Sequence, residues 1–118
     1  MLNSLYFIEA LNKTDEIITV EISINPEHEI LKAHFPDQAV VPGVCMLEMI
    51  KDVLSEARLK RMSLVQSSYV KFLHLLTPQQ TTHVSVVLNV KQQQNFISCD
   101  ASIQWGDTIF MKSKADYQ

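Results

Sequence analysis

The sequence is poor in the residues that mark several common classes of protein. It contains two cysteines, Cys45 and Cys99, in apolar surroundings and without a CxxC pair, so a disulfide framework is excluded. We expect both to be reduced core residues of an intracellular protein. The four histidines, at positions 28, 34, 74 and 83, have neither the HExxH pattern nor a Cys/His ligand spacing. We therefore expect neither a metal nor another cofactor.

A basic surface and a long apolar stretch are missing as well. Lysine and arginine number 10 against 13 aspartates and glutamates, and the resulting net charge of -3 argues against nucleic acid as a partner. No stretch approaches the length of a membrane span. Residues 1–10 lack the basic leader and the small-residue cleavage site of a signal peptide. These absences predict a cytoplasmic protein with no membrane partner.

The hydrophobic residues, 47% of 118, are enough to form one core and predict a single domain over residues 1–118. Apolar residues near helical spacing predict a short helix over residues 1–12. Residues 17–24 alternate between apolar and polar side chains, which is typical of a half-buried strand. A long helix is predicted over residues 43–58, mostly apolar in its first two turns and amphipathic afterwards.

The second half of the chain contains four runs that are typical of β-strands. They lie at residues 63–76, 81–93, 95–105 and 108–117, and Gly106-Asp107 is the clearest hairpin turn. Strands that follow one another through short connections pair antiparallel, and one long apolar helix needs a sheet to cover it. The pattern predicts an α+β fold, in which a curled antiparallel sheet wraps around one long central helix.

The segment from His34 to Glu48 combines a titratable base, a loop and a carboxylic acid at fixed separations. The loop ends at Pro42-Gly43, where a helix can begin. Every residue from 44 to 50 except Glu48 is apolar. Because burial of an unpaired carboxylate costs several kcal/mol, Glu48 is expected to be either paired or held protonated. Both states are typical of catalytic carboxylates.

These residues resemble the motif of a known family, the hot-dog-fold 3-hydroxyacyl-acyl-carrier-protein dehydratases of the FabZ and FabA type. That motif runs His-Phe-Pro, a short loop, Pro-Gly-Val and a helix with Glu or Asp. This chain has the family's spacing at His34, Phe35, Pro36, Pro42, Gly43, Val44 and Glu48. A second similarity covers Val70-Lys71-Phe72 and the turn at Thr77-Pro78. The resemblance thus extends over most of the chain and implies a hot-dog fold.

The chain departs from the family pattern at several places. Ala33 and Asp37 stand where the family usually has glycine, and Ala39 stands where it has a loop proline. After the helix acid, residues 49–52 replace the family's Ala- and Gln-containing turn. These changes leave both acid/base groups, His34 and Glu48, in place. They therefore bear on which substrate and which carrier the protein uses, rather than on the acid/base chemistry.

The resemblance implies dehydration of a 3-hydroxyacyl thioester to a trans-2-enoyl thioester, in fatty-acid or related lipid or polyketide-like biosynthesis. The substrate would be carried by acyl carrier protein or CoA. His34 suits removal of the C2 proton because neutral imidazole titrates near physiological pH. Glu48 in its protonated form suits the departure of the C3 hydroxyl as water.

The start of the helix supplies further parts of the site, and the resemblance adds an assembly. Backbone N–H groups around Gly43 and Val44 would stabilise the negative charge on the thioester oxygen. Phe35 and Pro42 would complete the substrate-binding residues. A homodimer or an oligomer of dimers is implied, in which His34 of one subunit meets Glu48 of the other.

Other interpretations of the same residues stay open. His34 can be a hydrogen-bonded turn or core histidine, and Glu48 can lie on a solvent-facing stripe with Asp52 and Ser55. Two other functions are a hot-dog acyl thioesterase and a non-catalytic partner subunit that binds acyl thioesters. The presence of both His-Phe-Pro and Glu48 favours the dehydratase. The altered loop at residues 37–39 leaves the non-catalytic partner subunit as an alternative.

Overall fold

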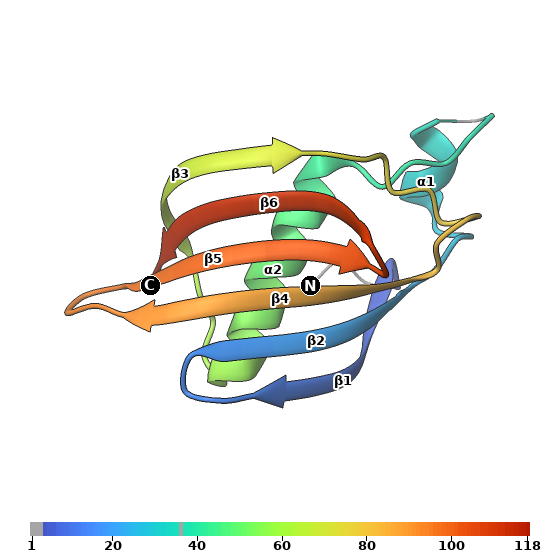
Figure 1. Cartoon of the computed structure of the whole chain (residues 1–118). Helices are drawn as coiled ribbons and strands as arrows, with labels where there is room; N and C mark the ends of the chain where they lie inside the picture. The colour runs from blue at the N-terminus through green and yellow to red at the C-terminus, as the bar shows by residue number, and fades with distance from the viewer. Residues whose placement is uncertain (1–3, 36) are drawn as a thin grey trace.

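A computed structural model describes residues 4–35 and 37–118 (Figure 1). It contains one six-stranded sheet and two helices. The strands are β1 (Tyr6–Lys13), β2 (Ile17–Ile24), β3 (Leu64–Phe72), β4 (His83–Gln92), β5 (Ile97–Trp105) and β6 (Thr108–Tyr117). The helices are α1 (Glu29–Ala33) and α2 (Gly43–Arg58). The bounds of β2, β6 and α2 are those predicted from the sequence.

All neighbouring strands are antiparallel, in the order β1-β2-β4-β5-β6-β3. The pairs β1–β2, β4–β5 and β5–β6 join strands that are consecutive in the chain. After β2 the chain passes through α1 and α2 and returns as β3 at the far edge, beside β6. The sheet curls, and α2 lies against its concave side (Figure 1). The predicted curled antiparallel sheet with one long helix is confirmed.

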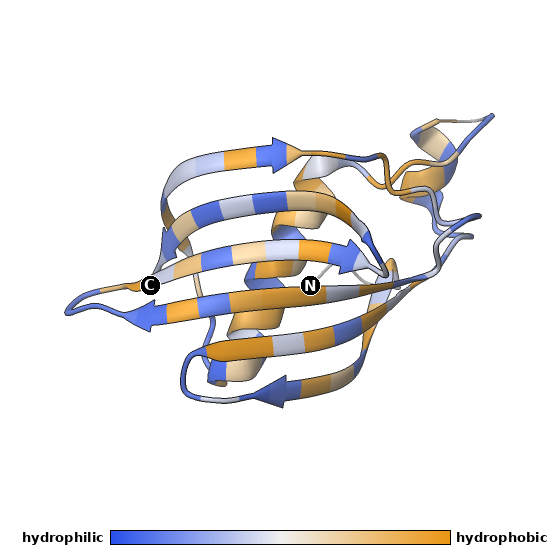
Figure 2. Ribbon diagram, viewed as in Figure 1, coloured by the Kyte–Doolittle hydropathy of each residue, from blue (hydrophilic) through white to orange (hydrophobic). Residues whose placement is uncertain are grey.

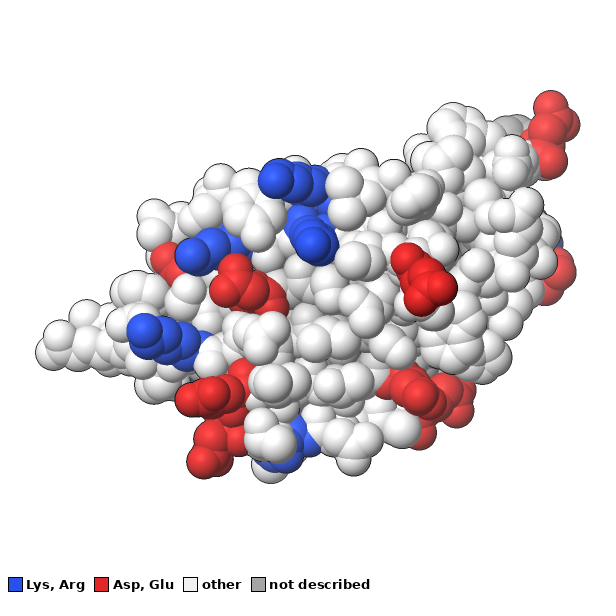
Figure 3. All heavy atoms as spheres, viewed as in Figure 1, with Lys and Arg blue, Asp and Glu red and all other residues white. Residues whose placement is uncertain are grey.

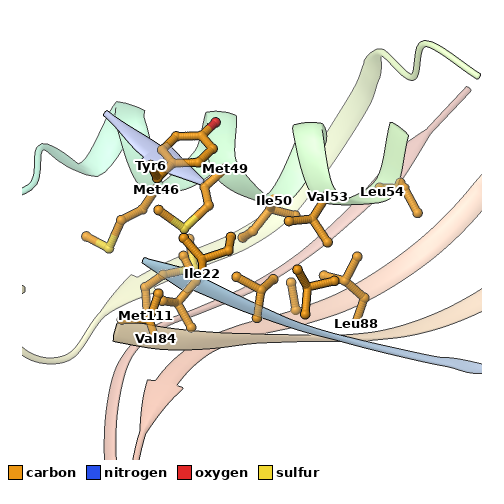
Figure 4. Close-up of a cluster of buried hydrophobic side chains, with 14 of the residues drawn as sticks. Tyr6, Ile22, Met46, Met49, Ile50, Val53, Leu54, Val84, Leu88 and Met111 are labelled. Atoms are coloured by element: carbon orange, nitrogen blue, oxygen red, sulfur yellow. The ribbon is translucent and has the colours of Figure 1, made fainter. Parts of the chain in front are cut away.

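The core lies between α2 and the concave face of the sheet (Figure 4). Buried residues recur with the period of a helix along α2 and with a period of two along each strand, as the geometry of the two elements requires. On α2 they are Cys45, Met46, Met49, Ile50, Val53, Leu54 and Ala57. On β2 and β4 they include Ile18, Val20, Ile22, Ile24, Val84, Val86 and Leu88. Fully burying one aliphatic side chain contributes about 1.5–3 kcal/mol, so this packing holds α2 on the sheet.

Polar contacts fix how α2 is turned about its own axis. The hydroxyl of Tyr6, on β1, donates a hydrogen bond to the carboxylate of Asp52. Lys13 Nζ donates to the carbonyl of Ala57 at 2.7 Å. The helix ends at Leu59, which has left-handed backbone angles (φ 53°, ψ 36°). These contacts tie α2 to the edge strand β1.

The prediction of a short helix over residues 1–12 is wrong. Residues 6–13 form the edge strand β1, paired along its length with β2, and residues 1–3 lie outside the described residues. A register shift between Ile8 and Ala10 interrupts the period-two alternation of the strand. The spacing of the apolar residues therefore resembled that of a helix, but pairing with β2 makes residues 6–13 a strand.

The predicted β-run over residues 63–76 is also longer than the strand it contains. β3 ends at Phe72, and the chain continues as a loop. The carbonyl of Leu76 accepts a hydrogen bond from the N–H of Val41 at 2.9 Å. This bond places the loop after β3 beside the loop that leads into α2, which is where the candidate site lies.

Charged side chains of both signs are interspersed on the face drawn in Figure 3. Such a mixture differs from the strongly basic surface that phosphate recognition needs. Neither of the described helices combines the length and the apolar character needed to span a bilayer.

Candidate active site

His34 lies immediately after α1, as its C-terminal cap. The backbone N–H donates to the carbonyl of Ile30 at 3.1 Å, and the carbonyl accepts from the N–H of Val40 at 2.9 Å. The ring atom Nδ1 is 3.3 Å from the carbonyl oxygen of Val40. When Nδ1 carries the proton it donates to this oxygen, and Nε2 keeps the lone pair that a base needs. This contact orients the half-buried imidazole and engages only one of its two ring nitrogens.

Phe35 lies beside this imidazole rather than in the core. The two rings are stacked, with centroids 4.2 Å apart and an interplanar angle of 26°. Phe35 is 54% exposed, and its N–H donates to the carbonyl of Gln38 at 3.3 Å. Pro36 lies outside the described residues. An exposed aromatic ring next to a candidate base is available to contact a ligand or another protein chain.

The N-terminus of α2 begins directly after Pro42. The N–H groups of Cys45 and Met46 donate to the carbonyl of Pro42 at 3.0 and 3.2 Å. The N–H groups of Gly43 and Val44 precede these two, where helix geometry offers no intrahelical acceptor. Within the described part of the chain, no side chain caps this end and no acidic residue lies in the first turn. The partial positive charge of the helix N-terminus therefore stays available for an anion or an oxyanion.

A largely apolar pocket of about 430 Å³ separates α2 from β3. Its helix wall is formed by Val44, Leu47, Glu48 and Lys51. The opposite wall and floor come from the start of β3 and from β6, namely Ser63, Leu64, Ser67, Val70, Ser113, Ala115 and Tyr117. The volume and the apolar lining are typical of a site for a small organic ligand. Glu48 is the acidic residue among these lining residues.

Glu48 is paired in this pocket. Its Oε1 accepts a hydrogen bond from Lys51 Nζ at 2.8 Å. The side chain of Glu48 is 37% exposed and that of Lys51 is 31% exposed. Of the two states expected from the sequence, the structure shows the paired one, and the deep burial assumed for a protonated acid is not found within one chain.

Glu48 and Lys51 also border a second cavity of about 440 Å³ with a different character. Its other lining residues are Asp52, Ser55, Glu56, Arg61 and Met62. The solvent-facing stripe of Glu48, Asp52 and Ser55 considered in the sequence analysis therefore exists. The pair of Glu48 and Lys51 lies at the boundary between this polar cavity and the apolar pocket. Glu48 therefore belongs both to the solvent-facing stripe and to the wall of the candidate site.

The two candidate acid/base residues belong to different groups within the chain. Glu48 lines the apolar pocket, whereas His34 is not among its lining residues. In the residues that the structure describes, no hydrogen bond or ring contact joins His34 to Glu48. One chain therefore presents a base beside Phe35 and an acid in the pocket as two separate parts.

Exposed apolar side chains surround both parts. They belong to β3, to the loop after it and to the N-terminus of α2, and are Val44, Leu64, Val65, Tyr69, Phe72, Leu73 and Leu75. Figure 2 shows orange ribbon in the loop after β3. Val44 is 74% exposed and Leu75 is 71% exposed. Several exposed apolar side chains beside an edge strand are typical of an interaction surface.

Comparison with known protein families identifies the family to which this chain belongs. A model of the ApeI-like family, described as ApeI dehydratase, matches residues 10–107. The chain belongs to the ApeI-like dehydratase family. The dehydratase class predicted from the sequence is thereby confirmed, with ApeI-like rather than FabZ or FabA as the family that matches. A comparison with curated protein sequences found no match.

Solved structures with the same fold include a chain of the dehydratase heterocomplex ApeI:P from Xenorhabdus doucetiae. It shares 16% identity at a TM-score of 0.72, over 94% of this chain and 96% of that chain. An uncharacterized protein from Erwinia carotovora subsp. atroseptica shares 22% sequence identity at a TM-score of 0.67, and the match covers 95% of this chain and 92% of that chain. A conserved protein from Pseudomonas aeruginosa shares 12% sequence identity at a TM-score of 0.68, and the match covers 97% of this chain and 87% of that chain. At these identities the likeness concerns the fold, and it is consistent with the predicted hot-dog fold.

Sequence reasoning missed two kinds of residue in this ApeI-like dehydratase. Lys51 was part of a noted departure from the FabZ and FabA pattern, and its i,i+3 spacing from Glu48 could have revealed the ion pair. The pocket floor on β6 carried no local signal, because it forms only when β3 pairs with β6. Burial raises the pKa of Tyr117 to about 12, with a smaller contribution from Cys99, so its hydroxyl stays protonated in the pocket wall.

Cys45 is the other titratable group close to the acid. Burial and, to a smaller extent, the charge of Glu48 raise the pKa of its thiol. The thiol is therefore neutral at physiological pH, and it packs in the core rather than acting as a nucleophile. Among the described residues, no group of three or more His, Cys, Asp or Glu side chains is placed to hold a metal ion.

Proposed function

We propose that this protein dehydrates 3-hydroxyacyl thioesters, carried by acyl carrier protein, to trans-2-enoyl thioesters. The observation that carries the proposal is the position of Glu48 in an apolar pocket, within the first two turns of α2, whose N-terminus has no side-chain cap. An apolar pocket suits an acyl chain, and a carboxyl group at its wall suits a proton transfer to the departing hydroxyl. Membership of the ApeI-like dehydratase family supports this reaction over others on the same fold.

The proposed roles divide the proton transfers between two side chains. Nε2 of His34 accepts the proton from C2, because its Nδ1 is engaged by the carbonyl of Val40. Glu48 gives a proton to the C3 hydroxyl, which leaves as water, and the C2–C3 double bond forms. The proton on His34 then passes to solvent, and Glu48 regains one from solvent, so the cycle is balanced.

The thioester oxygen gains negative charge when the C2 proton leaves, and the N-terminus of α2 is the proposed site for it. The N–H groups of Gly43 and Val44 supply donors on a rigid element, and such preorganised donors are worth most where charge develops. Pro42 sets the start of the helix, and Phe35 covers the acyl group near C2. The pantetheine-like arm of the carrier would enter between these residues and the exposed surface of β3.

A complete site needs a second subunit in this proposal. His34 and Glu48 lie in separate parts of one chain, and β3 is the last strand at one edge of the sheet formed by the described residues. Pairing of two β3 strands would cover the exposed apolar surface and bring His34 of one subunit to the pocket of the other. We therefore propose a homodimer with two shared sites, assembled from identical halves.

The reaction can be tested directly with purified protein and a 3-hydroxyacyl thioester. A dehydratase produces the ultraviolet absorbance of a 2-enoyl thioester without releasing a thiol, whereas a thioesterase releases free thiol without that absorbance. The His34→Ala variant is the matched control, because His34 is half-buried on a loop and its removal leaves the core intact. Absence of the enoyl product from the wild-type protein with both carrier-bound and CoA substrates would refute the proposal.

A second candidate is a partner subunit that binds acyl thioesters while a paired homologue completes the chemistry. One structural neighbour comes from a dehydratase heterocomplex, ApeI:P, which supports an association of this kind. The exposed surface along β3 can accept a different chain of the same fold as well as a second copy. Activity of the purified homodimer alone distinguishes the first candidate from the second.

A further inference from the structure

Lys51 is the positively charged residue among the described residues that line the apolar pocket. It follows Glu48 by three positions on α2, so both side chains emerge from the same side of the helix. Its Nζ lies 2.8 Å from Glu48 Oε1 and leaves the second carboxyl oxygen, Oε2, without this contact. The two oxygens of the proposed acid are therefore not equivalent.

An ion pair on an open surface contributes little, because water screens it. This pair differs because it borders an apolar pocket whose walls include Leu47 and Leu64. An acyl chain in the pocket, or a second subunit over it, displaces water from both side chains. The attraction between the two groups grows as the local dielectric constant falls. The pair is thus weakly coupled in the open pocket and strongly coupled in the occupied one.

We propose that Lys51 is a positioning residue for the reaction proposed above, on which this inference rests. Its ammonium group donates to Oε1 whether or not Glu48 is protonated, so the proton-bearing oxygen is Oε2. As Oε2 transfers that proton to the departing hydroxyl, the negative charge that develops on Glu48 is stabilised by Lys51. An interaction that strengthens as charge develops lowers the barrier more than it improves substrate binding.

Other charged and titratable groups face Glu48 from several elements. Asp52 and Glu56 lie on α2 along the polar cavity, and Arg61 lies on the segment after it. Tyr117 of β6 and Cys45 of α2 stay neutral at physiological pH because their pKa values are raised. Arg61 borders the polar cavity but not the apolar pocket. It therefore offers a matched cation whose removal should leave the orientation of Glu48 unchanged.

The test compares three variants in steady-state turnover of a 3-hydroxyacyl thioester. Lys51→Met keeps most of the apolar stem and removes the charge, and we expect kcat to fall about 10- to 100-fold with KM changed less than about threefold, as for loss of one charge-assisted hydrogen bond. Lys51→Arg should restore kcat to within a few-fold of wild type. Arg61→Met should leave both constants unchanged.

Wild-type kcat in Lys51→Met, or equal losses in Lys51→Met and Lys51→Arg, would overturn the role of Lys51. A binding experiment separates this result from failure of the dehydratase proposal. It uses stable amides of a 3-hydroxyacyl group and of its 3-deoxy counterpart, in which nitrogen replaces the thioester sulfur. If the wild type shows no turnover, it should still bind the 3-hydroxy amide about two- to threefold more tightly than the 3-deoxy amide, and Lys51→Met should lose this small preference while Lys51→Arg keeps it. No preference in the wild type would refute the inference.

Discussion

The ring of Phe72 lies directly against Gly43. A Cβ atom at position 43 would be 2.7 Å from Cζ of Phe72 and 3.1 Å from Cε1, closer than carbon atoms pack. Phe72 ends β3 and Gly43 begins α2, so this contact joins the edge strand to the N-terminus of the long helix. A side chain at position 43 would therefore displace the ring.

We expect Gly43→Ala to lower turnover at least about tenfold with little loss of fold stability. Phe72 is 52% exposed, so its ring can swing outward, and alanine is a better helix former than glycine. The displaced ring would then lie at the entrance to the proposed oxyanion site. Steady-state kinetics and thermal unfolding of the same samples measure the two effects separately.

A double-mutant cycle identifies the cause of that loss. If the ring is responsible, adding Gly43→Ala to Phe72→Ala should change turnover by less than about twofold, because nothing remains to be displaced. If Gly43→Ala still lowers turnover about tenfold when Phe72 is alanine, the new methyl group itself, and not the displaced ring, causes the loss.

The second prediction concerns the carboxyl group in the pocket. Glu48→Gln keeps the shape and the hydrogen-bond acceptor for Lys51 but has no carboxyl proton to donate. We expect kcat to fall at least about 100-fold, within the usual range for loss of general acid catalysis. Glu56→Gln, on the same helix but exposed and outside the apolar pocket, is the matched control and should stay near wild type. Activity of Glu48→Gln within a few-fold of wild type would exclude the acid role.

Much of this fold could be predicted because local patterns and tertiary structure agree. The helix Gly43–Arg58 has an apolar face with the right period, and β5 and β6 are joined by the Gly106 turn, where φ is +58°. β1 could not be predicted because its register shift hides the strand period.

The candidate site was predictable only in part, and for a related reason. Spacing in the chain identifies His34 and Glu48, but it cannot show that Lys51 pairs with Glu48 or that β6 forms the pocket floor. Those relationships depend on side-chain conformation and on pairing between strands distant in sequence. The meeting of His34 with Glu48 is a prediction about two chains, and it stays a prediction.

The third prediction concerns alkaline stability. Burial, with a smaller contribution from Asp100, raises the pKa of the Cys99 thiol from 9.0 to about 12. The unfolded chain releases this proton above pH 9, whereas the folded chain keeps it, so the contribution to stability is complete below pH 9 and is lost as pH rises toward 12. Each pH unit in this range removes about 1.4 kcal/mol.

Urea unfolding at a series of pH values from about 8 to about 11 compares the wild type with Cys99→Ala. The variant should be less stable at neutral pH because it loses a buried side chain, and its stability should decline less steeply above about pH 9. Tyr117 is retained in both proteins, and burial, which is the larger cause of its raised pKa, acts on it in both. Parallel declines would show that the Cys99 thiol titrates alike in the folded and unfolded chains.

The last prediction tests whether the site is shared between subunits. His34→Ala and Glu48→Gln should each be inactive as pure homodimers, since every site then lacks one group. In a mixed dimer, a shared site that takes His34 from one chain and Glu48 from the other carries either both lesions or neither. One of the two sites is therefore intact, and a fully exchanged equimolar mixture should recover about a quarter of wild-type activity, because half of the dimers are mixed.

Subunit exchange must be demonstrated in the same mixture, for example by mass spectrometry of one isotope-labelled variant. Full exchange without recovered activity would mean that each site is built within a single chain, so that His34 and Glu48 meet by a movement of the loop before α2. A monomer by light scattering would remove the shared site altogether. Recovery that requires exchange would instead place the two groups on opposite sides of one interface, because an intact site then combines His34 of one chain with Glu48 of the other.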